Sequence, residues 1–151
     1  MIGGGALREA SIVVKGRLQG PKSALPLGRV LIVEDEQAIA QGLRLLLEDE
    51  YDVMVASGGR AALDLLCGGE QFDVVLCDLM MPDVSGIELY AELKARVPGT
   101  EERLLFMTGG AFTPEAEAFL ERVPNPRVEK PFDLERMERL IRSVVRQRGN
   151  A

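Results

Sequence analysis

The chain has 151 residues, of which 46% are hydrophobic and 28% are charged, and its formal net charge is −6. This length suits one domain with a substantial core, and the composition is that of a globular protein rather than a disordered chain. No apolar run approaches the roughly 20 residues that a transmembrane helix needs, so membrane insertion is not expected. Two cysteines and no histidines exclude a disulfide framework, a His/Cys zinc site and a Ser-His or Cys-His catalytic pair.

Residues 1–27 differ in composition from the rest of the chain. The first 28 residues hold six of the 16 glycines and four basic residues against one acidic residue, so they carry +3 and the remainder about −9. Ile12-Val13-Val14 could form a brief strand, but we expect a flexible leader or the remnant of an upstream linker. The leader lacks the layout of a signal peptide, which favours a cytoplasmic location. The acidic remainder argues against direct binding of nucleic acid.

From residue 28 onward, short apolar runs alternate with amphipathic segments. The apolar runs predict buried strands, and the segments with a 3.6-residue period predict helices. The expected strands are 30–33, 51–56, 72–77, 104–107 and 127–129. The expected helices are 36–50, 60–67, 85–97, one that opens at Thr113-Pro114, and 134–146. Such alternation without hairpin signals predicts an α/β fold, with a doubly wound parallel sheet and helices on both faces.

Polar residues follow the predicted strands at the point where each strand ends. They are Glu34, Asp35, Asp78, Thr108 and Lys130. In a parallel sheet these ends share one edge, where ligands bind. Carboxylates a few ångströms apart repel by roughly 4 kcal/mol per pair at an effective dielectric of about 20, so the cluster needs a cation or shifted pKa values. Hard oxygen ligands favour Mg²⁺, and the whole set suits a phosphoryl group, with Asp78 as the nucleophile.

Three segments carry a resemblance to a known family. They are VLIVEDE at 30–36, VVLCDLMMPDVSG at 74–86 and EKPF at 129–132. Together they resemble the receiver domains of two-component response regulators over about residues 28–148, which leaves 149–151 as a tail. The resemblance implies a flavodoxin-like, doubly wound five-stranded parallel sheet of order 2-1-3-4-5. It also implies a phosphorylation-dependent signalling switch of a two-component phosphorelay rather than an enzyme.

The resemblance implies a phosphoryl acceptor and a metal site. Asp78 would accept a phosphoryl group from the phosphohistidine of a histidine kinase or a histidine phosphotransfer protein. Asp35, Asp78 and the carbonyl of Met80 would bind Mg²⁺ directly, and Glu34 would assist through water. Each acidic residue alone could instead cap a helix or a turn, so the prediction rests on their joint position at the strand ends.

The resemblance also implies how the phosphoryl group is held. Thr108 would be the switch hydroxyl, and Lys130 would pair with the phosphoryl group. The backbone amides of Leu79 and Gly109 would help to hold it. The Lys130-Pro131 peptide is expected to be cis, as is typical of the family.

Two features bear on how such a switch would signal. Arg127 stands three residues before the lysine, where the family usually has Tyr or Phe, so a coupled movement of hydroxyl and aromatic ring is not expected. The Arg127 side chain either makes a charge contact that changes on phosphorylation or is simply solvated. The last helix carries Arg136, Arg139, Arg142 and Arg146, which either form a solvated face or pair across a homodimer through this helix and the fifth strand. Residues 106–110 and 119–126 look more like hybrid-kinase receivers than like those of DNA-binding regulators.

Three other classes of protein fit less well. Phosphatases of the haloacid-dehalogenase type carry an Asp-x-Asp motif, in which the second Asp is a general acid. The corresponding position here is Met80, which cannot donate a proton. A degenerate receiver that serves only as a docking module would not need the acidic, hydroxyl and lysine positions that are all present. A Rossmann nucleotide-binding domain would need Gly-x-Gly-x-x-Gly after the first strand, and this motif is missing.

Overall fold

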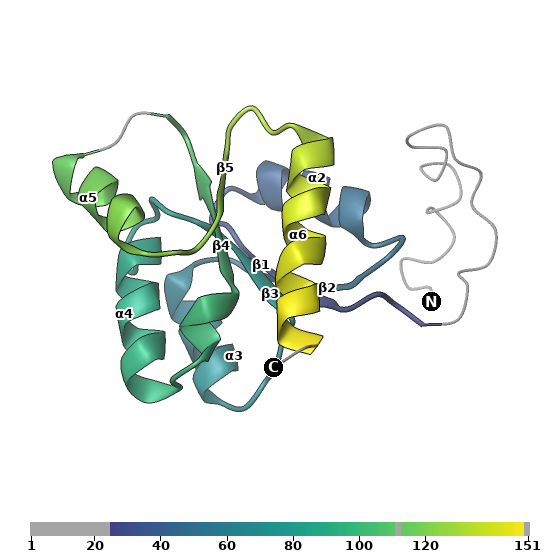
Figure 1. Ribbon diagram of the computed structural model, residues 1–151, viewed down its shortest axis with the longest axis horizontal. Coiled ribbons are helices and arrows are strands. Elements are labelled where there is room, and N and C mark those ends of the chain that lie inside the picture. Colours follow the sequence, from purple (N-terminus) through teal and green to yellow (C-terminus); the bar gives the residue numbers. More distant parts are fainter. Residues whose placement is uncertain (1–24, 111–112, 150–151) are drawn as a thin grey trace.

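The computed structural model describes residues 25–110 and 113–149. Five parallel strands form one sheet of order β2-β1-β3-β4-β5 (Figure 1). The strands are β1 (Arg29–Val33), β2 (Asp52–Ala56), β3 (Val74–Asp78), β4 (Leu104–Thr108) and β5 (Arg127–Glu129). The predicted fold class and strand order are confirmed. The predicted leader falls mostly outside the described residues, and the domain boundaries stay a prediction.

Helices cover both faces of the sheet. They are α2 (Gln37–Leu47), α3 (Gly59–Cys67), α4 (Gly86–Arg96), α5 (Pro114–Arg122) and α6 (Leu134–Gly149). Helices α2 and α6 pack on one face, and α3, α4 and α5 pack on the other (Figure 1). A 3₁₀ helix, η2 (Thr100–Arg103), precedes β4 and was not predicted. Helix α2 ends at Leu47, three residues before the expected position, and the chain turns there toward β2.

The central strands are buried on both faces, which explains their unbroken apolar runs. Alternate residues of β1 point to opposite sides of the sheet. Leu31 and Val33 join the core under α3, α4 and α5, whereas Val30 and Ile32 join the core under α2 and α6. Both cores end at the same carboxyl edge of the sheet, so the residues that follow the strands are held by rigid elements.

A glycine lets the segment after β3 fold back onto the strand. A Cβ at Gly86 would lie 3.0 Å from both Asp78 O and Leu79 Cα, so a side chain there would crowd the end of β3. Helix α4 starts at this glycine with a capping box, in which Ser85 Oγ accepts from Glu88 N and the Glu88 carboxylate accepts from Ser85 N. The 74–86 motif therefore supplies both an acidic strand end and the tight turn that frames it.

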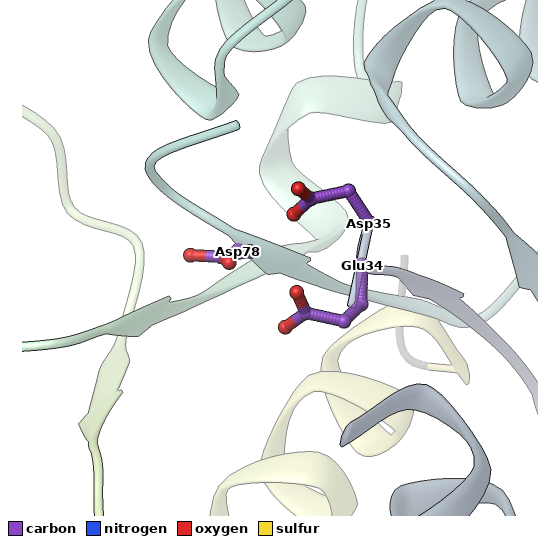
Figure 2. Close-up of side chains that lie close together, drawn as sticks. All are labelled: Glu34, Asp35 and Asp78. Carbon is purple, nitrogen blue, oxygen red and sulfur yellow. The ribbon is translucent and has the colours of Figure 1, made fainter. Parts of the chain in front are cut away.

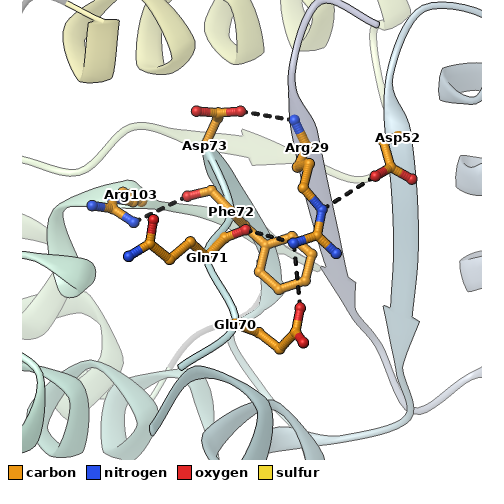
Figure 3. A network of polar contacts seen from close by, with 7 residues as sticks. All are labelled: Arg29, Asp52, Glu70, Gln71, Phe72, Asp73 and Arg103. Carbon is orange, nitrogen blue, oxygen red and sulfur yellow. Dashed lines mark hydrogen bonds and ion pairs between the residues drawn. The ribbon is translucent and has the colours of Figure 1, made fainter. Parts of the chain in front are cut away.

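At the opposite, amino-terminal edge of the sheet, Arg29 ties three segments together (Figure 3). Its guanidinium donates to Asp52 at 3.2 Å, to Glu70 at 3.3 Å and to the carbonyl of Gln71 at 2.9 Å. It also lies over the Phe72 ring, 4.4 Å from the centroid. One side chain thus joins β1, β2 and the connection from α3 to β3.

We expect Arg29→Ala to destabilise the fold by about 1–2 kcal/mol, because several exposed polar contacts and one cation–π contact are lost together. Arg96→Ala is the control, since Arg96 pairs with Glu92 at 3.5 Å within one helix, an interaction worth about 0.3–0.5 kcal/mol. Urea unfolding midpoints of both variants measure the difference. Equal shifts for the two variants would contradict a joining role for Arg29.

Candidate functional site

The carboxyl edge of the sheet brings three predicted acidic residues together (Figure 2). Glu34 and Asp35 follow β1, and Asp78 is the last residue of the neighbouring β3. One carboxylate oxygen from each lies within 4.8 Å of the others. Glu34 and Asp78 are 1% and 6% exposed, whereas Asp35 is open to solvent. The site is therefore a mostly buried acidic cluster with one open side.

Lys130 reaches this cluster from the far side of β4. Its Nζ lies 3.5 Å from Asp78 Oδ2 and 3.6 Å from Glu34 Oε1, so one ammonium is shared by two buried carboxylates. Its backbone N–H donates to Thr108 O at 2.8 Å, which extends the pairing of β5 with β4. The Lys130-Pro131 peptide is cis, as the resemblance implied.

The Thr108 hydroxyl is buried but turned away from the cluster. Thr108 is 1% exposed at the end of β4, and its Oγ1 donates to Val128 O at 3.5 Å. At that distance the hydrogen bond is weak, so rotation of the Thr108 hydroxyl toward Asp78 would cost little free energy.

The backbone amides around Asp78 correct one prediction. The Leu79 N–H donates to Met107 O at 2.9 Å, so it continues the β3–β4 ladder and does not face the cluster. The Met80 N–H donates instead to Asp78 Oδ1 at 3.3 Å. The prediction for the Leu79 amide is therefore wrong on geometric grounds, and Met80 supplies the inward N–H. Gly109 follows Thr108 at an exposed position of the same edge.

Burial dominates the electrostatics of Glu34. The pKa of this carboxyl is raised from 4.5 to about 7, mainly by desolvation and also by Asp78, while the Glu36 amide and Lys130 act in the opposite direction. Because the folded state holds the Glu34 proton more tightly than the unfolded chain, stability decreases as pH rises from about 4.5 to 7. An added cation would offset this cost by favouring the ionised carboxylate.

The donor set fits a divalent cation. Glu34 Oε1 is fully buried and has no hydrogen-bond partner among the described residues, although Lys130 lies 3.6 Å away. Three carboxylates within reach of one another match the preference of Mg²⁺ for hard oxygen ligands.

The sequence model described as response regulator receiver domain matches residues 30–142. The chain belongs to the response regulator receiver domain family. This receiver domain is 36% identical to YkoG of Bacillus subtilis, an uncharacterized transcriptional regulatory protein. The 123 aligned residues cover 81% of this chain and 53% of that protein. It is 31% identical over 119 residues to the response regulator ArlR of Staphylococcus epidermidis, covering 78% of this chain and 52% of that protein.

The chain spans about half the length of these curated relatives. Among solved structures, the receiver domain is similar to that of a Francisella response regulator, 1452, with 25% identity and a TM-score of 0.69, covering 80% of this chain and 98% of that one. No helix in the described part of this receiver combines the length and apolar character needed to cross a bilayer.

Two further predictions concern side chains near the site. Cys77 is fully buried beside Asp78, burial raises the pKa of its thiol, and the thiol donates to Asp78 O at 3.2 Å. It therefore stays protonated and acts as packing, as expected of a structural cysteine. Arg127 of this receiver is exposed on β5, and a signalling role for it stays untested.

Proposed function

We propose that this receiver domain is a phosphorylation-dependent switch in which Asp78 accepts a phosphoryl group from a phosphohistidine, with Mg²⁺ as cofactor. One observation carries the proposal. The Lys130 ammonium lies within 3.6 Å of both Asp78 and Glu34, at the one edge of the sheet where the strand-end carboxylates meet. A nucleophilic carboxylate beside a fixed cation suits phosphoryl transfer, in which positioning and charge stabilisation supply most of the catalysis.

The metal would be held by Asp35, Asp78 and the Met80 carbonyl, with Glu34 acting through water. When bound, Mg²⁺ supplies positive charge that offsets the charge of the phosphoryl oxygens. Two observations support this assignment. Glu34 Oε1 is buried and has no hydrogen-bond partner among the described residues, and the three carboxylates lie close enough together to share one ion.

The chain's own residues account for the transfer. A carboxylate oxygen of Asp78 attacks phosphorus in line, the oxygen–phosphorus bond forms, and the phosphorus–nitrogen bond to imidazole breaks as the imidazole leaves. The N–H groups of Met80 and Gly109 donate to the new phosphoryl oxygens, and Lys130 Nζ pairs with them. Thr108 then gives up its 3.5 Å contact with Val128 O and donates its hydroxyl to the phosphoryl group.

The movement of Thr108 would alter the neighbouring α5–β5–α6 face, where a homodimer is supported by complementary charge. Exposed carboxylates line α5, at Glu115, Glu117 and Glu121. Exposed guanidinium groups line α6, at Arg136, Arg139, Arg142 and Arg146. In a two-fold dimer the acidic helix of one protomer would meet the basic helix of its partner, which is how an isologous interface becomes self-complementary.

The partner that delivers the phosphoryl group would be a histidine kinase or a histidine phosphotransfer protein in the cytoplasm. Similarity to the response regulator ArlR supports a place in such a two-component pathway. Both cysteines are free thiols, in keeping with a reducing compartment.

Intact mass spectrometry tests the proposal. The full chain is incubated with phosphoramidate, a small donor whose phosphorus–nitrogen bond resembles that of phosphohistidine, with Mg²⁺ or with EDTA. We expect one added phosphoryl group only with Mg²⁺, located by peptide mapping on the segment that contains Asp78. Absence of an adduct, together with no change in amide chemical shifts of Asp35 and Met80 on adding Mg²⁺, would contradict the switch and favour a docking module.

A further inference from the structure

Strand β2 forms one edge of the sheet, and among the described residues no strand pairs with its outer side. The Asp52 N–H donates to Gly28 O at 2.9 Å, so this residue and every second one after it face β1. The backbone N–H and C=O groups of Val53 and Val55 therefore face outward. An edge of this kind can bind an extended segment through main-chain hydrogen bonds.

Two cavities follow this edge. The first, of about 460 Å³, lies beside Tyr51 and Val53, toward the amino end of β2. The second, of about 500 Å³, lies beside Met54 and Val55 and is also lined by residues of α2 and α3. All three residues from Val53 to Val55 are half-buried, so an occupant would cover apolar surface that the sheet leaves open. We call this feature the β2 groove, defined by residues 53–55 and the two cavities.

The β2 groove is acidic toward both ends. The first cavity is lined by carboxylates of Glu48, Asp49 and Glu50, and the second by those of Asp35 and Asp64. Among the described residues that line the two cavities, the one guanidinium is that of Arg44, and it lies 3.7 Å from a Glu48 oxygen. The groove therefore favours an occupant in which basic residues flank an apolar stretch.

The charge of the groove also disfavours a second copy of the chain as the occupant. Two β2 edges that met would bring one acidic rim against another, and juxtaposed like charges oppose association. The position of the groove suits a partner instead. Glu34 and Asp35 line its second cavity, so a segment bound there would lie beside the acidic site. Such docking would raise the local concentration of the partner at that site.

We propose that the β2 groove docks an extended segment of a partner protein, in which basic residues flank alternating β-branched residues. The backbone of this segment would pair with the outward N–H and C=O groups of Val53 and Val55. Its β-branched side chains would cover the half-buried part of β2. Its basic residues would meet the carboxylates at the two ends of the groove.

Amide hydrogen exchange of the full chain, followed by NMR, tests the proposal with a synthetic probe. The probe is the peptide acetyl-Lys-Lys-Val-Thr-Val-Thr-Lys-Lys-amide. At saturation we expect the amides of Val53 and Val55 to exchange at least about tenfold more slowly than without peptide. The Met54 N–H faces β1 and is the internal control, with unchanged exchange. The same peptide with Glu in place of Lys should protect neither valine.

Two further comparisons separate charge attraction from backbone pairing. The double variant Glu50→Gln, Asp64→Asn should bind the peptide at least about fivefold more weakly, whereas Glu102→Gln, Glu121→Gln, at exposed positions away from β2, should bind within about twofold of wild type. The peptide is also made in two forms, N-methylated at complementary sets of alternate residues. Since neighbouring N–H groups of a strand point to opposite sides, one form should lose the protection and the other should keep it.

Three results would overturn the proposal. Exchange of Val53 and Val55 that stays unchanged on adding the peptide would show that the edge does not bind such a segment. Equal binding of both N-methylated forms would show attraction of charge without backbone pairing. Protection of the two valines before any peptide is added would assign the edge to a second copy if it increases with protein concentration, and to the chain itself if it does not. None of these readouts depends on phosphorylation, so the outcome is independent of the proposed switch.

Discussion

Asp78→Asn is expected to abolish the magnesium-dependent phosphoryl adduct, lowering the rate of its formation by at least ~10³-fold. The carboxylate is the attacking group, and an amide of the same shape lacks both its charge and its nucleophilicity. The fold should survive, because the substitution preserves volume and removes one of the charges that oppose ionisation of Glu34. Intact mass after incubation with phosphoramidate and Mg²⁺ measures the loss.

Asp83→Asn is the matched control for this variant. Asp83 stands five residues further along, is exposed, and has a φ of 68°, a left-handed conformation that Asn tolerates well. The same chemical change there should leave adduct formation within about twofold of wild type. A phosphoryl adduct that persists in Asp78→Asn but disappears in another acidic variant would assign the acceptor elsewhere.

Gly59→Ala is expected to destabilise the fold by about 1–3 kcal/mol, although alanine is the better helix former. A Cβ at Gly59 would lie 2.4 Å from Val84 O and 2.7 Å from Val84 Cβ. Relief requires a shift of the connection between β3 and α4, which also carries the backbone of Met80. We therefore expect slower adduct formation as well as a lower urea midpoint.

Gly42→Ala makes the same change where space is open. Gly42 lies inside α2, and in the described part of the chain no atom outside its own helical backbone and chain neighbours lies within 4 Å of the added methyl group. Helix propensity then acts alone, and we expect a gain of about 0.5–1 kcal/mol with unchanged phosphorylation. Because the two substitutions are expected to change stability in opposite directions, they separate the effect of steric crowding from that of helix propensity. Stabilisation by Gly59→Ala would show that the contact with Val84 relaxes without cost.

The amino-acid sequence determined the elements and the composition of the site. Unbroken apolar runs occur where strands are covered on both faces, so β1, β3 and β4 could be located without coordinates. Because parallel strands end at one edge, their order in the chain was enough to group Glu34, Asp35, Asp78, Thr108 and Lys130. The order 2-1-3-4-5 came from the resemblance, since alternation alone does not specify which strands are neighbours.

Only the tertiary structure decided the directions of individual polar groups. The Leu79 N–H faces Met107 and the Met80 N–H faces Asp78, because pairing of β3 with β4 sets the side to which each amide points. The pKa of Glu34 is raised because neighbouring layers remove its solvent, which no local pattern records. Local periodicity determines which residues are strands, helices and strand ends. Hydrogen-bond direction, solvent exclusion and open edges arise only when segments distant in sequence pack together.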